Sequence, residues 1–142
     1  AQETGYAEAV TRALAHAELP ATAVSVVESA SIGLRTVDQA EATALAKLLP
    51  GEARAVPAVL SSVTHQIGHT LGVSGMAAVL KATVELEHGQ VPATPGVTHP
   101  LSVVTTQPDL LRVAAEPQPL KGTLPQGKTA AVVTNSAANG AV

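Results

Sequence analysis

Two histidines, His65 and His69, lie four residues apart in the chain. Imidazoles four positions apart can bind a metal from one face of a helix, and a single imidazole can donate a hydrogen bond to a developing anion. Gly68 between them disfavours a regular helix, and no carboxylate completes a zinc-protease motif. We therefore expect no metal, and His69 is left as a candidate for catalysis, with the alternative that it only packs or caps the start of the following helix.

Asp38 and Glu41 form a second candidate group, since paired carboxylates can act as acid and base. Both lie near the start of a predicted helix, where carboxylates favour the helix dipole and satisfy free N–H groups. We prefer this structural role. The chain has no cysteine, which excludes disulfides, thiolate metal sites and a cysteine nucleophile within it.

The elements that position these residues alternate between helical periodicity and short β-branched runs. This order, α-β-α-β-α, is typical of a layered α/β domain with a largely buried sheet. In the helix at 73–87, four apolar side chains share one side, namely Met76, Ala77, Leu80 and Val84. The first predicted helix is capped by Thr4 and stopped by Pro20, and a strand at 23–28 and a turn at Gly33 follow it. The second helix is capped by Thr36 and ended by Pro50-Gly51, and a strand at 56–63 follows. A loop at 64–75 that contains several glycines then leads into the helix at 73–87, which Gly89 ends.

The composition of the chain changes after Val91, where prolines become frequent. Six of its ten prolines lie between Pro92 and Pro119, which predicts an extended connector at 93–121 that wraps a surface. Within it only residues 101–105 have a strand-like pattern. A final strand is expected at 129–134, and we treat residues 1–142 as one domain.

The composition limits both the core and the partners. Hydrophobic residues make up 46% of the chain, but there is one Tyr and no Phe or Trp, so Ala, Val and Leu must form the core. Such a core gains less from burial per residue, and we expect a partner surface to add to it. With a net charge of −3, the chain does not have the excess of basic residues that is typical of nucleic-acid-binding proteins. No stretch is long enough for a membrane span, so we expect a cytoplasmic protein.

Residues 27–34 carry the first part of a family resemblance. They read V-E-S-A-S-I-G-L, followed by Asp38 and Glu41. This resembles the motif V-E-A-H-G-T-G-T, with an Asp and a Glu downstream, in the C-terminal half of β-ketoacyl synthases, the condensing enzymes of fatty-acid and polyketide assembly. The glycine is kept at Gly33, but Ala30 stands in place of the family's catalytic histidine.

Residues 62–69 resemble the family's second motif, S-V-K-S-N-I-G-H. They read S-V-T-H-Q-I-G-H, which keeps the histidine at His69 and replaces the lysine by Thr64. The end of the chain, from 131, is a weaker match to the glycine-rich loop F-G-F-G-G-T-N that lines the family's active site. The resemblance thus implies that Ala30, Gly33, Thr64, Asn139 and Gly140 belong to the pocket and its loops.

The resemblance implies a thiolase-like fold, of which this layered α-β-α chain is the C-terminal half. In the complete fold two similar halves stack their sheets around buried helices, so a half alone leaves a broad apolar face open. Another chain, or an upstream segment of the same polypeptide, is expected to supply the rest. The family's nucleophilic cysteine lies in that N-terminal half, and its two histidines assist decarboxylation of the malonyl group.

With one histidine lost, the pattern is closest to polyketide chain-length factors, which are inactive homologues that pair with an active ketosynthase. The implied function is to shape the acyl pocket of such a pair, with acyl groups delivered on the phosphopantetheine of acyl carrier protein and no cofactor of its own. An alternative is a composite β-ketoacyl synthase site in which His69 assists condensation at a cysteine of another chain. A third hypothesis is a free-standing α/β binding domain. We do not expect the chain alone to be an active enzyme.

Overall fold

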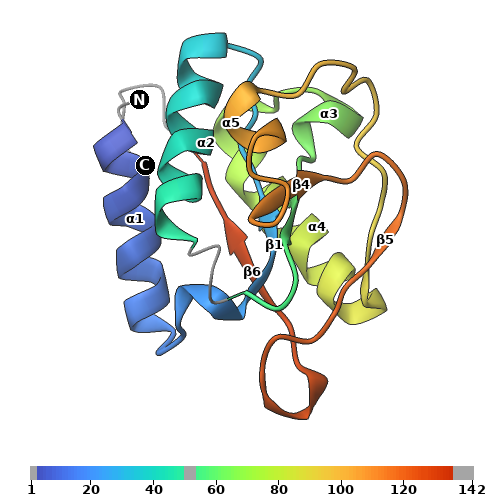
Figure 1. Ribbon diagram of the computed structural model, residues 1–142. Helices are drawn as coiled ribbons and strands as arrows, with labels where there is room; N and C mark the ends of the chain where they lie inside the picture. The colour runs from blue at the N-terminus through green and yellow to red at the C-terminus, as the bar shows by residue number, and fades with distance from the viewer. Residues whose placement is uncertain (1–2, 50–53, 136–142) are drawn as a thin grey trace.

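The computed structural model describes residues 3–49 and 54–135, which form a twisted parallel sheet with helices on both faces (Figure 1). The main sheet has the order β4-β2-β1-β6, and β3 and β5 form a separate antiparallel pair. The elements are α1 (Glu3–His16), β1 (Val24–Glu28), α2 (Arg35–Leu48), β2 (Ala58–Ser61), α3 (Thr64–Ile67), α4 (Ser74–His88), β3 (Gln90–Val91), α5 (Ser102–Thr105), β4 (Leu111–Val113), β5 (Gln118–Pro119) and β6 (Ala130–Val133).

The helices form two layers around the sheet. Helices α1, α2 and α5 cover one face, where Val27 of β1 packs with Leu45 of α2. Helix α4 covers the other face, and Val26 belongs to the small core on that side. The register of β1 against β6 shifts between Val24 and Val26, so the strand's alternation changes phase there. All five residues of β1 are buried, as a central strand covered on both faces requires.

The order of elements predicted for the first ninety residues is confirmed, with local corrections. Helix α1 includes Glu3 and Thr4, so Thr4 lies within the helix and is not its cap. The N-cap of α2 is Leu34 with no side-chain cap, so Thr36, the predicted cap, lies inside the first turn. The predicted loop after β2 contains the short helix α3. Gly89 does end α4, with φ of 64°, the left-handed conformation that glycine adopts most readily. Pro50-Gly51 lies outside the described residues.

The proline-rich part is less extended than expected. The prediction of a strand at 101–105 is wrong, because residues 102–105 form α5, whose Val104 is buried in the core beside α2. The segment 93–121 also contributes β4, which pairs with β2 at the edge of the main sheet. Leu110 and Leu111 are buried and hold the strand there, because apolar side chains in a proline-rich segment still gain free energy when they leave water.

Helix α4 presents small residues to the sheet and large ones to solvent. Ala78 and Ala82 are buried, whereas Met76 and Leu80 of the predicted apolar side are 62% and 61% exposed. With neighbouring residues of the preceding segment they form what we call the α4 apolar face, which consists of Ile67, Leu71, Val73, Met76, Val79, Leu80 and Val84. Across the described ranges, no helix has the length and apolarity needed to span a bilayer.

Candidate functional site

The loops that follow β1, β2 and β6 meet at one edge of the sheet. These strands run parallel, so their C-terminal ends lie side by side, and ligands of open α/β sheets bind at this edge. The loop after β1 carries Ala30 and Gly33, the turn after β2 leads into Thr64, and β6 is followed by Thr134. The two motifs of the sequence are therefore brought together at this edge.

Ala30 and Thr64 are in direct contact. The Thr64 hydroxyl donates a hydrogen bond of 2.8 Å to the carbonyl oxygen of Ala30. Ala30 itself is buried, and its N–H donates to Oε1 of Glu41 at 3.0 Å. This places a methyl group, which can neither donate a hydrogen bond nor carry charge, where the motif has a histidine.

Glu41 and Asp38 hold the loop after β1 in place. Glu41 accepts N–H bonds from Ala30 and, at 3.3 Å, from Ser31, and it also accepts the hydroxyl of Thr134. Asp38 accepts the N–H of Gly33 at 3.1 Å, and Gly33 has φ of 83°, a conformation that favours glycine. The N–H groups they satisfy are those of the loop, rather than those of α2 as expected.

Burial is the dominant influence on both carboxyl groups. Desolvation raises the pKa of Glu41 above 4.5, opposed by its hydrogen bonds from Thr134 and the loop. Desolvation also raises the pKa of Asp38, opposed by the N–H groups of Gly33 and Ile32 and by the charge of His65. Both oxygens of Glu41 are engaged by the fold, whereas Oδ1 of Asp38 has no hydrogen-bond partner among the described residues.

Replacing Glu41 by glutamine is expected to flatten part of the pH dependence of stability. Because the pKa of Glu41 is higher in the folded state, the native state binds the proton more tightly than the unfolded chain. The wild-type free energy of unfolding should therefore rise as pH falls toward 4.5, and this rise should be smaller in Glu41→Gln. Urea unfolding of both proteins across this window measures it, and equal slopes would contradict the assignment.

His69 lies in the segment between α3 and α4. Its Nδ1 accepts the N–H of Leu71 at 3.1 Å, so the neutral ring carries its proton on Nε2. The residue is exposed between Ile67 and Leu71 of the α4 apolar face. The imidazole is therefore oriented by the backbone and open toward the side that the fold leaves uncovered.

Within residues 3–49 and 54–135, no group of three or more His, Cys, Asp or Glu side chains is placed to hold a metal ion. His65 and His69 are separated by Gly68, whose φ of 83° ends α3 and breaks the helical spacing between them. The break in regular helix expected at Gly68 is therefore present.

The start of α4 contacts the loop after β6. The Ser74 hydroxyl lies 3.0 Å from Oδ1 of Asn135. A Cβ added at Gly75 would approach the Asn135 amide to 2.9 Å, so glycine permits this contact. Asn139 and Gly140, predicted as pocket residues, lie outside the described residues.

A buried charge network beneath this edge was missed from the sequence. The ammonium of Lys81 on α4 lies 2.6 Å from Glu28 at the end of β1 and 2.7 Å from Glu85 one turn on, and it also contacts the Ser61 hydroxyl. Glu28 further accepts the N–H of Val63. The signal available in the sequence was a lone Lys81 in an apolar helix four residues before Glu85.

This network joins α4 to the ends of both central strands. The Glu28 side chain is fully buried, and desolvation raises its pKa above 4.5 while the hydrogen bond and charge of Lys81 lower it. A buried carboxylate is tolerated when a partner charge and hydrogen bonds compensate it. Lys81 thereby fixes the edge from which Ala30 and Thr64 project.

Comparisons with known proteins agree with this architecture. Residues 1–98 match the family model of the beta-ketoacyl synthase C-terminal domain. Polyketide synthase GfsB of Streptomyces halstedii is 36% identical over 112 residues, which cover 78% of this chain and 2% of that protein. Spectinabilin polyketide synthase system protein NorA of Streptomyces orinoci is 36% identical over 92 residues, covering 64% of this chain and 5% of NorA.

Solved structures superpose over almost the whole chain. The oxazolomycin ketosynthase domain OzmH KS8 of Streptomyces albus JA3453 has a TM-score of 0.82 at 25% identity, covering 97% of this chain and 36% of that one. The ketosynthase from module 6 of the bacillaene synthase of Bacillus subtilis has a TM-score of 0.84 at 22% identity, covering 99% and 26%. The predicted thiolase-like fold of a C-terminal ketosynthase half is confirmed, and the chain belongs to the beta-ketoacyl synthase C-terminal domain family.

Proposed function

We propose that this chain is a non-catalytic ketosynthase-like half-subunit of the chain-length-factor type. In this proposal residues 1–142 form one C-terminal domain that packs against a ketosynthase N-terminal half. That half comes from another chain or from an upstream segment. The pair would shape the pocket that holds the growing acyl chain, without performing the condensation at this chain's own edge.

The observation that carries the proposal is Ala30. Decarboxylation of a malonyl group produces an enolate, and a ketosynthase needs donors already oriented toward its oxygen. At the place of the first motif histidine this chain has a buried methyl group, with Glu41 and Thr64 occupying the backbone N–H and carbonyl around it. The motif lysine is also replaced, by Thr64. The edge keeps its structure but lacks two of the charged or donor groups that the reaction uses.

The α4 apolar face supports the half-subunit part of the proposal. Soluble monomers rarely expose many large apolar side chains close together, and here seven are exposed on α4 and the segment just before it. The chain also spans only 2% to 5% of the curated relatives described above, and 26% to 36% of the chains in the two superposed structures. A ketosynthase N-terminal half is the surface that would cover this face.

The remaining partners follow from the relatives. Two of them carry polyketide synthase names, so we propose polyketide assembly in the cytoplasm as the setting. Acyl groups would reach the assembled pocket on the phosphopantetheine of acyl carrier protein. No cofactor of the chain's own enters this proposal.

A second candidate function rests on His69. Its Nδ1 is held by the Leu71 N–H, and its Nε2 is therefore available as a donor on the open face. In a composite active site this donor would face the enolate that decarboxylation forms on the carrier-bound malonyl group, while that enolate attacks the acyl thioester on a cysteine of the other half and releases the cysteine thiolate. The two candidates differ in what the loss of His69 does.

Replacing His69 by alanine in the assembled pair is expected to leave condensation unchanged, because the proposal gives this site no catalytic role. The assay measures decarboxylation of malonyl-acyl carrier protein and formation of β-ketoacyl product, using the chain with its co-purified ketosynthase partner. His88→Ala, which changes an exposed histidine at the end of α4, is the matched control. A loss of about a hundredfold or more in His69→Ala alone would favour the composite active site.

A further inference from the structure

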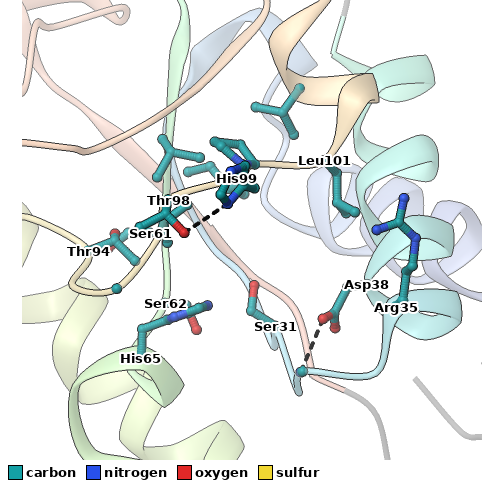
Figure 2. Close-up of a pocket in the computed structure, with 17 residues that line it drawn as sticks. Ser31, Arg35, Asp38, Ser61, Ser62, His65, Thr94, Thr98, His99 and Leu101 are labelled. Carbon is teal, nitrogen blue, oxygen red and sulfur yellow. Dashed lines mark hydrogen bonds between the residues drawn. The ribbon is translucent and has the colours of Figure 1, made fainter.

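A cavity of about 340 Å³ lies between α2, α3, α5 and the segment at 94–100, a size at the lower end of small-molecule sites (Figure 2). In Figure 2, Ser62, His65 and Thr94 lie on one side and Arg35 and Asp38 on the other, with His99 above them. Aliphatic side chains complete the wall, among them Leu60, Leu101, Val104 and Val113.

Two hydroxyl groups in the wall have unused hydrogen-bonding capacity. Ser62 is 2% exposed and Thr94 is 7% exposed, so both residues are buried. Among the described residues, neither Ser62 Oγ nor Thr94 Oγ1 has a hydrogen-bond partner. Buried hydroxyls are normally paired, and leaving one unpaired costs free energy, so these two indicate a polar occupant.

The charges in the wall indicate that this occupant is neutral. Arg35 and Asp38 are the only Arg, Lys, Asp or Glu residues in the described lining, and their charges cancel. An anion would enter beside the Asp38 carboxylate, and a cation would enter beside the Arg35 guanidinium. A neutral hydroxylated molecule can donate to the carboxylate and accept from the guanidinium, the imidazoles and the hydroxyls.

The cavity is separate from the α4 apolar face. Much of its wall comes from α2, α5 and the segment at 94–100, whereas α4 covers the opposite face of the sheet; the wall and the α4 apolar face approach each other at α3, which contributes His65 to the wall and Ile67 to that face. Covering α4 by a ketosynthase half therefore does not by itself fill this space. Gly33 is shared with the loop after β1, so an occupant would contact the loop that also holds Ala30.

We propose that this cavity is a binding site for a small neutral polyol, which pairs its hydroxyl groups with Ser62 and Thr94 and rests its carbon skeleton on Leu101 and Val104. The proposal does not depend on pairing with a ketosynthase half or on any activity of His69.

The test is a titration of the full chain, in the assembly in which it purifies, monitored by amide signals in NMR. The probes are D-ribose and myo-inositol, with acetate, inorganic phosphate and methylammonium as charged counterparts. We expect the polyols to produce saturable shifts confined to residues 31–38, 62–65 and 94–101, with a Kd in the millimolar range. Absence of saturable polyol binding, or tighter binding of a charged probe, would overturn the proposal.

Variants identify the groups that bind. Ser62→Ala and Thr94→Val each remove one unpaired hydroxyl at nearly constant shape, and each is expected to weaken polyol binding about tenfold. Thr106→Val removes an exposed hydroxyl outside the cavity and should leave the affinity unchanged. The two cavity hydroxyls come from different segments, so one variant remains informative if the other fails to fold. Wild-type affinity in a folded cavity variant would refute the assignment.

Discussion

Replacing Lys81 by methionine is expected to destabilise the chain by about 3–5 kcal/mol, the cost of breaking a buried ion pair from one side. The change leaves Glu28 and Glu85 buried with side-chain exposures of 0% and 2%, and it removes the cation that lies within 2.7 Å of both. Methionine preserves the length and most of the apolar volume of the side chain. The loss of stability therefore comes from the uncompensated charges rather than from a cavity. Urea unfolding at neutral pH measures the change in the free energy of unfolding.

The matched control for this prediction is Lys47→Met. Lys47 pairs with Glu3 at the surface, with side chains 68% and 38% exposed, and such pairs contribute about 0–1 kcal/mol. Adding Glu28→Gln and Glu85→Gln to Lys81→Met should restore part of the lost stability, because the uncompensated charges are then gone. A destabilisation by Lys81→Met no larger than that of the control would show that the network does not hold the sheet edge.

The elements that could be predicted are those whose own residues carry a clear strand or helix pattern. The run at 23–28 is β-branched and lies between turn residues, and the helix that follows repeats apolar residues at helical spacing, so β1 and α2 were predicted correctly. The proline-rich part could not be predicted in the same way. Strand β4 forms because Leu110 and Leu111 pack against β2, which is a tertiary effect, and it has only three residues.

The same distinction applies to the site. Ala30 and Thr64 were placed together through the two motifs, and their hydrogen bond is consistent with that placement. Lys81 and Glu28 are 53 positions apart, and their pairing depends on which face α4 turns to the sheet. The pattern of the sequence grouped Met76, Leu80 and Val84 on one side of this helix without indicating which side faces the sheet. The small residues Ala78 and Ala82 pack inward, because they let the helix lie close to the strands.

Replacing Leu80 by lysine is expected to weaken pairing with the ketosynthase partner by at least about a hundredfold. Leu80 lies on the α4 apolar face and is 61% exposed in the chain alone, so a lysine there costs the isolated chain little. In the pair the same position would be buried, and an unpaired ammonium in an apolar interface costs about 3 kcal/mol or more. Each 1.4 kcal/mol corresponds to a factor of ten in Kd. Size-exclusion chromatography with light scattering, followed by a titration of the separated partners, measures the change.

Thr11→Lys is the matched control, since Thr11 is exposed on α1, on the opposite face of the sheet. It introduces the same charge on the same scaffold and should leave the affinity for the partner unchanged. The comparison separates a specific interface from a general effect of net charge, because both variants shift the total charge equally. If Leu80→Lys pairs as tightly as Thr11→Lys, the α4 apolar face is not the surface that joins the two halves, and the half-subunit proposal loses its structural support. If only Leu80→Lys dissociates, the exposed leucine and methionine of α4 are explained as an interface that the isolated chain leaves open.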